Sequence, residues 1–387
     1  MHEFYENVAI PYPLSYRSRS MRYLVSADKF KGTLTAFESC DVIARSIRQL
    51  DRNAQVDCLP IADGGEGTSE IIGLQLGANR LSLPTLDPLH RKVSADCFVN
   101  GHEAYLDMSS ASGLWRIPPD ERVPLRSTTF GTGLMIRQLA IRGIKQLFLG
   151  LGGSATVNAG IGMAAAIGYQ FFDDRDDIVT PVPEEFVRVR RVGAPVSISI
   201  PHVIGLVDVD TPLLGPGGAM CTFGPQKGLS LRQIDQLDRE LSLLVQRLRG
   251  QDGPRHWTTP GSGAAKGLGF GVLRFLGGKL VSGFSIVADR LDIRSKIARA
   301  DVVITEEGRL DSQSLRGKGP FAVAQLAREL DRPVWAVAGI IEDSECVTDH
   351  FDRVASLVSR EVSLQQALTH PRAALSSATK RLLGQSA

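Results

Sequence analysis

Four apolar runs that are typical of β-strands are each followed directly by residues able to bind ligands. A single acid at such a point is often only the cap of the next helix. Four stretches rich in acids, glycine or lysine go beyond capping, because ligands of open α/β sheets bind at the carboxyl ends of the strands. The four are DKFKG at residues 28–32, DGGEGT at 63–68, Asp208, and EEGRLD at 306–311.

These residue types suit phosphate and Mg²⁺ chemistry. Mg²⁺ binds through one or two protein carboxylates together with phosphate oxygens. Glycine lets backbone N–H groups approach an anion, and the N-terminus of a helix favours negative charge. Lys31, Lys227 and Lys318 each lie next to a glycine and could provide point charges for phosphoryl oxygens.

The sequence GLGGSATVNAG at residues 150–160 is also typical of a phosphate-binding loop. It follows the apolar run KQLFL and precedes IGMAAAI, so a strand, a glycine turn and a helix are predicted in succession. No lysine closes this loop, and its only long polar side chain is the neutral Asn158. The loop therefore predicts a cradle of backbone and hydroxyl groups, whose counter-charge must come from lysines elsewhere.

Several common signatures are absent from the sequence. It contains no GxxxxGK[ST] loop, no HRD or DFG kinase signature, and no HExxH or CxxC metal pattern. Residues 150–153 make a poor dinucleotide fingerprint, which leaves a nicotinamide enzyme poorly supported. The histidines are scattered, so a carboxylate is the expected general base.

Composition and charge exclude other classes of partner. The chain of 387 residues has 44 Lys and Arg against 42 Asp and Glu, so no nucleic acid partner is expected. No apolar run is long enough to span a bilayer, so no membrane partner is expected either. Residues 1–20 lack the apolar core of a signal peptide. They predict a flexible extension on a cytoplasmic protein, with Met21 as an alternative start.

Apolar strand-like runs alternate with helical patterns, which predicts an α/β fold with mainly parallel sheets. Thr35 and Glu38 have the spacing of a capping box at the start of a predicted helix over residues 35–50. Strands near both chain ends predict one discontinuous domain with the middle of the chain inserted in it. Predicted strands cover residues 23–27, 56–61, 147–150, 203–207, 302–305, 334–338 and 354–358. Further helices are predicted at residues 67–76, 132–141, 231–248, 320–330 and 364–383.

Taken together, these stretches resemble the glycerate kinase family of bacterial glyoxylate and glucarate metabolism. PIADGGEGT at residues 60–68 and FGPQKG at 223–228 match that family's motifs without change. Partial matches follow the same order from residue 23 to near the C-terminus. They are DKFKGTLTA at 28–36, ASGL at 111–114, GTGLMI at 131–136, PGSGAAKGLG at 260–269 and VITEEGRLDSQS at 303–314.

The resemblance implies ATP-dependent phosphorylation of D-glycerate with Mg²⁺. The product is 2-phosphoglycerate in most of this family, and 3-phosphoglycerate is the older assignment. The resemblance also implies two α/β domains around a cleft. One is a discontinuous Rossmann-like domain of residues 21–80 and 290–387, and the other is an inserted domain of residues 81–289. The oligomeric state stays open, with a homodimer as one alternative.

Roles for the matching residues follow from the needs of phosphoryl transfer, which are positioning and neutralisation of charge. Asp63 and Glu66 are hypothesised to hold Mg²⁺, directly or through water. Asp28 or Asp208 would orient or deprotonate the attacking hydroxyl, and the sequence does not decide between them.

The cations of the matching motifs are expected to bind the anionic groups. Lys31 and Lys227 would neutralise the charge of the transferring phosphoryl group. Arg309 would hold the glycerate carboxylate in a bidentate pair. The further expected substrate or nucleotide contacts are Gly64, Gly65, Gly152, Gly153, Ser154, Asn158, Gln226, Glu307, Asp311 and Lys318.

The chain departs from the family motifs at several places. Asn158 stands where the family has an acid, Thr211 where it has Asn, and Lys266 and Glu306 where it has Gly. A missing acid–base group costs roughly 10²- to 10⁴-fold in rate, and Glu306 would be strained if that glycine has a positive φ. Three alternatives stay open: an active glycerate kinase, a kinase for another small hydroxy acid, and a weakened member that binds ligand for regulation.

Overall fold

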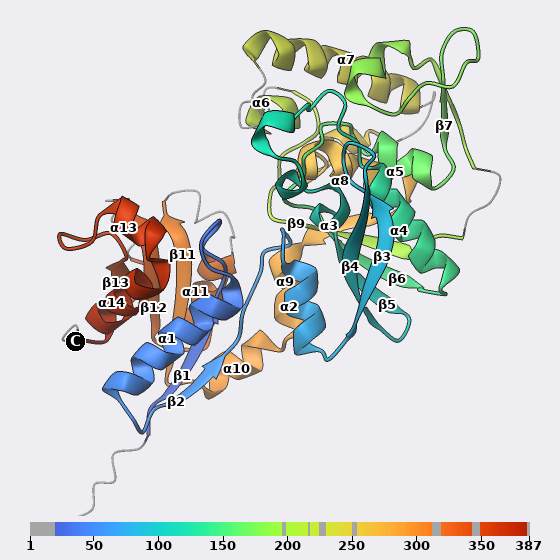
Figure 1. The fold of residues 1–387 in the computed structure, drawn as a ribbon. Helices are drawn as coiled ribbons and strands as arrows, with labels where there is room; N and C mark the ends of the chain where they lie inside the picture. Colours follow the sequence, from blue (N-terminus) through green and yellow to red (C-terminus); the bar gives the residue numbers. More distant parts are fainter. Residues whose placement is uncertain are drawn as a thin grey trace, which may run out of the picture.

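The computed structural model describes residues 20–195, 199–215, 217–223, 230–249, 254–311, 319–342 and 349–384, so Gln226, Lys227 and Lys318 lie outside it. Five parallel strands form the first sheet, in the order β13-β12-β11-β1-β2. Both ends of the chain contribute to this sheet, which is coloured blue and orange to red (Figure 1). Its strands are β1 (Arg22–Ala27), β2 (Gln55–Cys58), β11 (Val302–Leu310), β12 (Val334–Ile341) and β13 (Arg353–Ser356).

Helices cover both faces of the first sheet. Apolar residues of α1 and α14 pack on one face, and those of α10 and α11 pack on the other. The predicted capping box at the start of α1 is confirmed, because Thr35 Oγ1 accepts from the Glu38 N–H at 3.2 Å and Glu38 Oε2 accepts from the Thr35 N–H at 2.9 Å. The helices are α1 (Ala36–Leu50), α10 (Ile293–Arg299), α11 (Gly319–Glu329), α13 (Leu364–Thr369) and α14 (Pro371–Gly384).

The second sheet has the order β10-β9-β6-β5-β4-β3. Strands β5, β6, β9 and β10 run parallel, whereas β3 and β4 are antiparallel to their neighbours. The predicted α/β fold with mainly parallel sheets is thus confirmed. The strands are β3 (Asn79–Leu86), β4 (Lys92–Asn100), β5 (Glu103–Asp107), β6 (Gln146–Gly150), β9 (His202–Val207) and β10 (Lys279–Ser282).

One face of the second sheet packs on helices α4, α5 and α8. Its other face packs on α2 and α9, in a core that continues without a break to the first sheet and α11. Leu206 and Val303, on strands of different sheets, both belong to this core, so the two sheets share one packed interior. The helices are α2 (Thr68–Gln75), α3 (Ser109–Ser112), α4 (Phe130–Ile141), α5 (Ile161–Ala166), α8 (Ala264–Phe275) and α9 (Gly283–Arg290).

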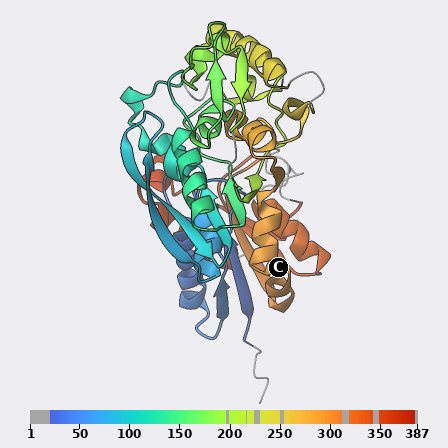
Figure 2. The same cartoon turned by 90° about the vertical axis from the view of Figure 1, so that its right-hand side faces the viewer.

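A third apolar cluster covers the end of the second sheet that is remote from the C-terminal helices. Its elements lie at the top of both views (Figures 1 and 2). They are β7 (Gln170–Phe172), η3 (Pro183–Arg188), β8 (Arg191–Gly193), α6 (Ala219–Phe223), α7 (Leu231–Arg249) and η5 (His256–Thr258), while η1 (Leu114–Arg116) and η2 (Pro119–Glu121) follow α3. Within the described ranges, no helix combines the length and apolar character that crossing a bilayer requires.

Several parts of the chain differ from the sequence-based elements, among them residues 279–299, where the unpredicted β10, α9 and α10 form. No element was predicted over residues 79–107, where β3, β4 and β5 form. Pro84 weakens the strand signal there, and the structure tolerates it because β3 is an edge strand. The single helix predicted over 364–383 is wrong, since Pro371 starts a separate helix. Helix α8 was missed because its first turn is rich in glycine and left-handed backbone.

The packing of α2 on β4 leads to a prediction about Gly73. A Cβ at Gly73 would lie 2.3 Å from Cγ of Phe98, a ring that is only 3% exposed. Alanine favours a helix over glycine by about 1 kcal/mol, but overpacking a core costs about 1–3 kcal/mol. Gly73→Ala should therefore destabilise the protein by up to about 2 kcal/mol, measured by urea unfolding. Leu74→Ala is the control: Leu74 is the next residue of the same helix, is 52% exposed, and should change stability by less than about 0.5 kcal/mol. A stabilised Gly73→Ala protein would contradict the packing.

Candidate active site

The acids that follow strands of both sheets lie in one electrostatic cluster. Burial, followed by the carboxylate of Asp63, raises the pKa of Asp28 to about 7, and Asp208 adds to the rise. Lys29 opposes it by its charge and by a 2.7 Å hydrogen bond from its backbone N–H to Asp28 Oδ1. The stretches after β1, β2 and β9 therefore supply neighbouring carboxylates, and Glu306 on β11 also responds to the charge of Asp28.

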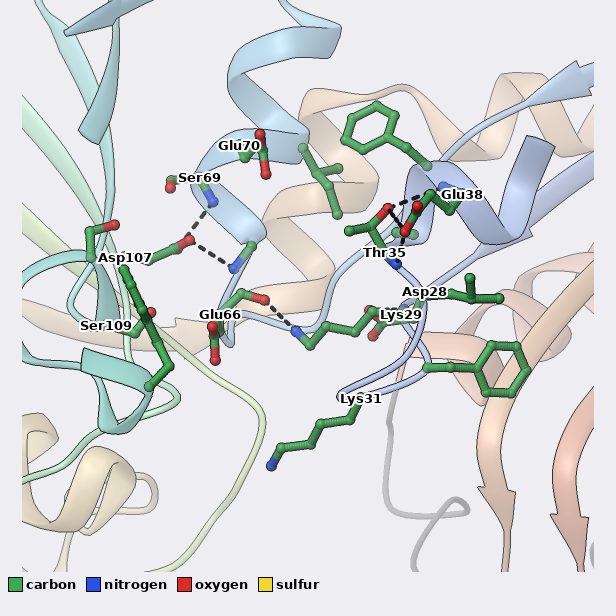
Figure 3. Close-up of a pocket in the computed structure, with 18 of the residues that line it drawn as sticks. Asp28, Lys29, Lys31, Thr35, Glu38, Glu66, Ser69, Glu70, Asp107 and Ser109 are labelled. Carbon is green, nitrogen blue, oxygen red and sulfur yellow. Dashed lines mark hydrogen bonds between the residues drawn. The ribbon is translucent and has the colours of Figure 1, made fainter. Parts of the chain in front are cut away.

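Lys29 is the cation at the centre of this cluster. Its Nζ donates a hydrogen bond to the backbone carbonyl of Glu66 (Figure 3). Burial lowers the pKa of Lys29, but the carboxylates of Asp28, Asp63 and Asp107 outweigh burial and the net shift is upward. Lys29 thus remains charged and holds the loop after β1 against the loop that precedes α2.

A cleft of about 490 Å³ opens between the loop after β1, the start of α2 and the residues that follow β5. Lys31 extends into this space, with Glu66 and Ser109 on the other side (Figure 3). Lys31 is exposed, and no ion pair within the described residues includes it. Asp28 also lines the cleft. The structure therefore brings an uncompensated cation close to the acid cluster.

Asp107 was missed by the sequence analysis. It ends β5, and its carboxylate accepts the backbone N–H groups of Gly67 at 2.9 Å and Ser69 at 3.1 Å. Burial raises its pKa to about 6, although these hydrogen bonds and the charge of Lys29 oppose the rise. Asp107 thereby caps α2 and fixes the turn that carries Glu66. Asp107 also follows an apolar strand, as Asp28 and Asp63 do. The sequence did not reveal it, because β5 was not predicted as a strand.

The predicted glycines bring three loops together at the strand ends. A Cβ at Gly152 would lie 2.6 Å from Cα of Gly65, and one at Gly64 would lie 2.9 Å from Cα of Gly283. Gly153 has φ +69°, and a Cβ there would lie 3.0 Å from a carboxylate oxygen of Glu66. The glycines at 64, 65, 152 and 153 thus permit close approach of backbones beside the cleft, although only their neighbours line it.

The second half of the 150–160 loop is buried. Asn158 Oδ1 accepts from the Gly160 N–H and the Thr129 hydroxyl, both at 3.2 Å, and Asn158 Nδ2 lies 3.4 Å from Thr128 Oγ1. The Ser154 hydroxyl is also buried and accepts the Thr156 N–H at 3.0 Å. Ser154 therefore stabilises the loop itself, and Asn158 connects the loop to Thr128 and Thr129. Neither side chain lines the cleft.

Three residues of this region have left-handed backbone without being glycine. Ala159 has φ 50°, Ala265 has φ 48° and Lys266 has φ 56°, and such conformations cost of order 1 kcal/mol each for a residue with a Cβ. Lys266 is buried, and its Nζ donates to the Ser154 carbonyl at 3.1 Å. The substitution of Lys for a family glycine thus adds a tie between α8 and the glycine-rich loop.

The residues of the last motif lie farther along β11. Arg309 pairs with Glu342 at 3.1 Å, and both side chains are about half exposed. Neither Arg309 nor Glu307 nor Asp311 lines the cleft. Within the described part of the chain, no three His, Cys, Asp or Glu side chains lie close enough together to hold a metal ion.

Glu306 has an unusual environment. Its backbone is extended, paired with Ala27 and Val337, so the strain expected at a positive φ does not arise. The side chain is fully buried, and among the described residues neither carboxylate oxygen has a hydrogen-bond partner. Burial, then Asp28 and Glu307, raises its pKa well above the usual range. Glu306 is therefore held as a neutral acid beneath the site.

This burial predicts a dependence of stability on pH. An unfolded chain releases the Glu306 proton near its ordinary pKa, whereas the native protein retains it. The native state then binds more protons, so its stability falls as the pH rises from 5 to 7, by up to about 1.4 kcal/mol per pH unit from this group. Glu306→Gln should remove that part of the slope in urea unfolding at pH 5, 6 and 7. Glu329→Gln, at an exposed surface pair, should follow the wild-type slope. Equal slopes for wild type and Glu306→Gln would contradict the prediction.

Comparison with known proteins identifies the family to which the chain belongs. A family model described as the glycerate kinase family matches residues 23–386. The glycerate kinase of Bacillus subtilis is 36% identical over 357 residues, which are 90% of this chain and 94% of that protein. The glycerate 2-kinase of Escherichia coli is 35% identical, with coverage of 90% and 93%. A solved structure named as a glycerate kinase 2 of Salmonella typhimurium LT2 has a TM-score of 0.77 at 32% identity and covers 94% of this chain and 97% of its own. The chain belongs to the glycerate kinase family.

Proposed function

We propose that this chain transfers the terminal phosphoryl group of ATP to a hydroxyl of D-glycerate, and that 2-phosphoglycerate is the product rather than 3-phosphoglycerate. Family membership and the activities named for the Bacillus subtilis and Escherichia coli relatives support a phosphotransferase with an alcohol acceptor. The observation that carries the proposal is the exposed Lys31 in a cleft that it shares with the half-buried Asp28. A cation next to a carboxylate of raised pKa provides both charge neutralisation and a proton acceptor.

Asp28 is our choice for the general base. A base works best when its pKa is close to the operating pH, and the pKa of Asp28 is about 7. Asp28 lines the cleft, whereas Asp208 does not. Asp208 then acts through its charge, which favours the protonated form of Asp28 once the hydroxyl proton has been accepted.

Lys31 would neutralise the phosphoryl group during transfer, when negative charge is spread over its oxygens. Lys227, Gln226 and Lys318 lie outside the described residues, and we keep them as further contacts to phosphate or nucleotide. Gly152, Gly153 and Ser154 would contribute backbone N–H groups.

Asp63 and Glu66 would hold Mg²⁺, which neutralises the charge of the phosphates when bound. The donor set suits this ion, because Mg²⁺ takes only one or two protein carboxylates and completes its shell with phosphate oxygens and water. Repulsion between Asp63 and Asp28 also marks a place where a divalent cation would be stabilised.

Arg309 remains our candidate for the glycerate carboxylate, with Glu307 or Asp311 fixing its position. One of its partners, Glu342, is half exposed, and such a surface pair contributes only about 0–1 kcal/mol. Loss of this one pair on binding a substrate carboxylate would therefore cost little. We further propose a cytoplasmic protein with domains at residues 21–80 with 290–387 and at 81–289, either as a monomer or as a homodimer.

The activity is tested by following ADP release with D-glycerate, ATP and Mg²⁺, and by identifying the product. Turnover to 2-phosphoglycerate supports the proposal. Turnover only with another hydroxy acid would identify that acid as the substrate in place of D-glycerate. Nucleotide binding without turnover of any hydroxy acid would favour a regulatory member of the family.

Replacement of Lys31 tests the main role. Lys31→Ala should lower kcat by roughly 10²- to 10³-fold, because it removes a charge that stabilises the transition state. The matched control is Lys380→Ala on α14, an exposed lysine that does not line the cleft, on a helix that packs against α1. Its kcat should equal that of wild type. A Lys31→Ala protein that folds and keeps full kcat would refute the assignment.

A further inference from the structure

Trp115 is the feature of the cleft that phosphoryl chemistry does not explain. It lies in η1, lines the cleft and is 58% exposed. The other two tryptophans, Trp257 and Trp335, are only partly exposed. A large aromatic ring facing solvent inside a cleft suits a ligand with an apolar, planar part.

The indole is held in place rather than free to turn. The Arg116 guanidinium lies 4.5 Å from the centroid of the Trp115 ring. Arg116 is fixed in turn by hydrogen bonds to the carbonyls of Ser110 at 2.5 Å and Ser94 at 2.8 Å. On another side, a Cβ at Gly113 would lie 2.7 Å from the indole nitrogen. The ring is thus preorganised, which reduces the entropic cost of binding a ligand.

Trp115 is also tied to the glycine-rich loop. The Leu114 N–H donates to the Gly153 carbonyl at 2.8 Å, and Gly113 forms a bridge with Ser154. Trp115 lines the same cleft as Ser109, Glu66 and Lys31. Figure 3 shows Ser109 and Glu66 near each other, with Lys31 extending into the cleft from the loop after β1. A molecule that places phosphates near Lys31 in this cleft therefore has Trp115 within reach of its other end.

The chemistry of the ring distinguishes between the two substrates. The face of an aromatic ring carries negative potential, which disfavours a carboxylate and favours an uncharged planar ring. Stacking on aromatic side chains is a general mode of binding nucleobases. The volume of about 490 Å³ also falls in the range of sites for drug-sized ligands, and a three-carbon acid would leave most of it empty.

We propose that Trp115 stacks on the base of the nucleotide, with the phosphates directed past Ser109 toward Lys31. This inference rests on the proposed function, since it assigns one part of the same cleft to ATP. Glycerate would then bind at the acid cluster around Asp28.

Fluorescence tests the stacking directly. In Trp257→Phe/Trp335→Phe, Trp115 is the only tryptophan, and ADP should quench its emission in a saturable manner. Inorganic tripolyphosphate and D-glycerate, which lack a base, should leave the emission unchanged. Unchanged emission at saturating ADP, or equal quenching by tripolyphosphate, overturns the inference.

Kinetics provide the second test. Trp115→Ala should raise the KM for ATP by about 10-fold or more, because base stacking on an aromatic residue is worth about 1–3 kcal/mol. The KM for glycerate and kcat should stay within about threefold, Trp115→Phe should recover part of the loss, and Trp257→Phe should match wild type. A loss that falls on glycerate, or no loss, refutes the stacking while turnover still supports the proposed function. Quenching by ADP without turnover of D-glycerate would instead refute the proposed substrate and leave the stacking intact.

Discussion

Close backbone packing among the loops after β2, β6 and β10 sets the distance between the two sheets. A Cβ at Gly283 would lie 2.2 Å from Cα of Gly64, and one at Gly152 would lie 2.6 Å from Cα of Gly65. Any side chain at these points would push the loops apart. Because Asp63 and Glu66 lie in the same loop, their positions depend on this contact. The apolar core that α2 and α9 share with both sheets packs next to this contact and stabilises it.

The free site is electrostatically unsatisfied. A rise in the pKa of Asp28 from 3.8 to about 7 corresponds to on the order of 4 kcal/mol in favour of the neutral acid. Lys29 offsets only part of this, since its ammonium is shared with Asp63 and Asp107. Such an arrangement is better suited to a bound cation and a proton from substrate than to the empty protein. Strongly shifted pKa values of this kind are concentrated at functional sites.

The sequence predicted the features that depend on local patterns. The pattern of an acid after a predicted strand identified Asp28, Asp63 and Asp208. The spacing of Thr35 and Glu38 identified the start of α1. It could not predict features that depend on which strands become neighbours. Asp107 was missed because β5 has no strong strand signal, and the burial of Asn158 arises from Thr128 and Thr129, which are distant in sequence. Trp115 was not singled out, because its exposure in a cleft is a property of the folded chain alone.

The order of the strands also has a consequence during synthesis on the ribosome. Tyr23 of β1 pairs with Val302 of β11, and Val303 pairs with Val334 of β12. The first two strands therefore emerge long before their central partner exists. At roughly 5–20 residues per second, the interval lasts on the order of tens of seconds, and all strands of the second sheet are made within it. The second sheet can form first, while one edge of β1 remains unpaired until β11 has been made.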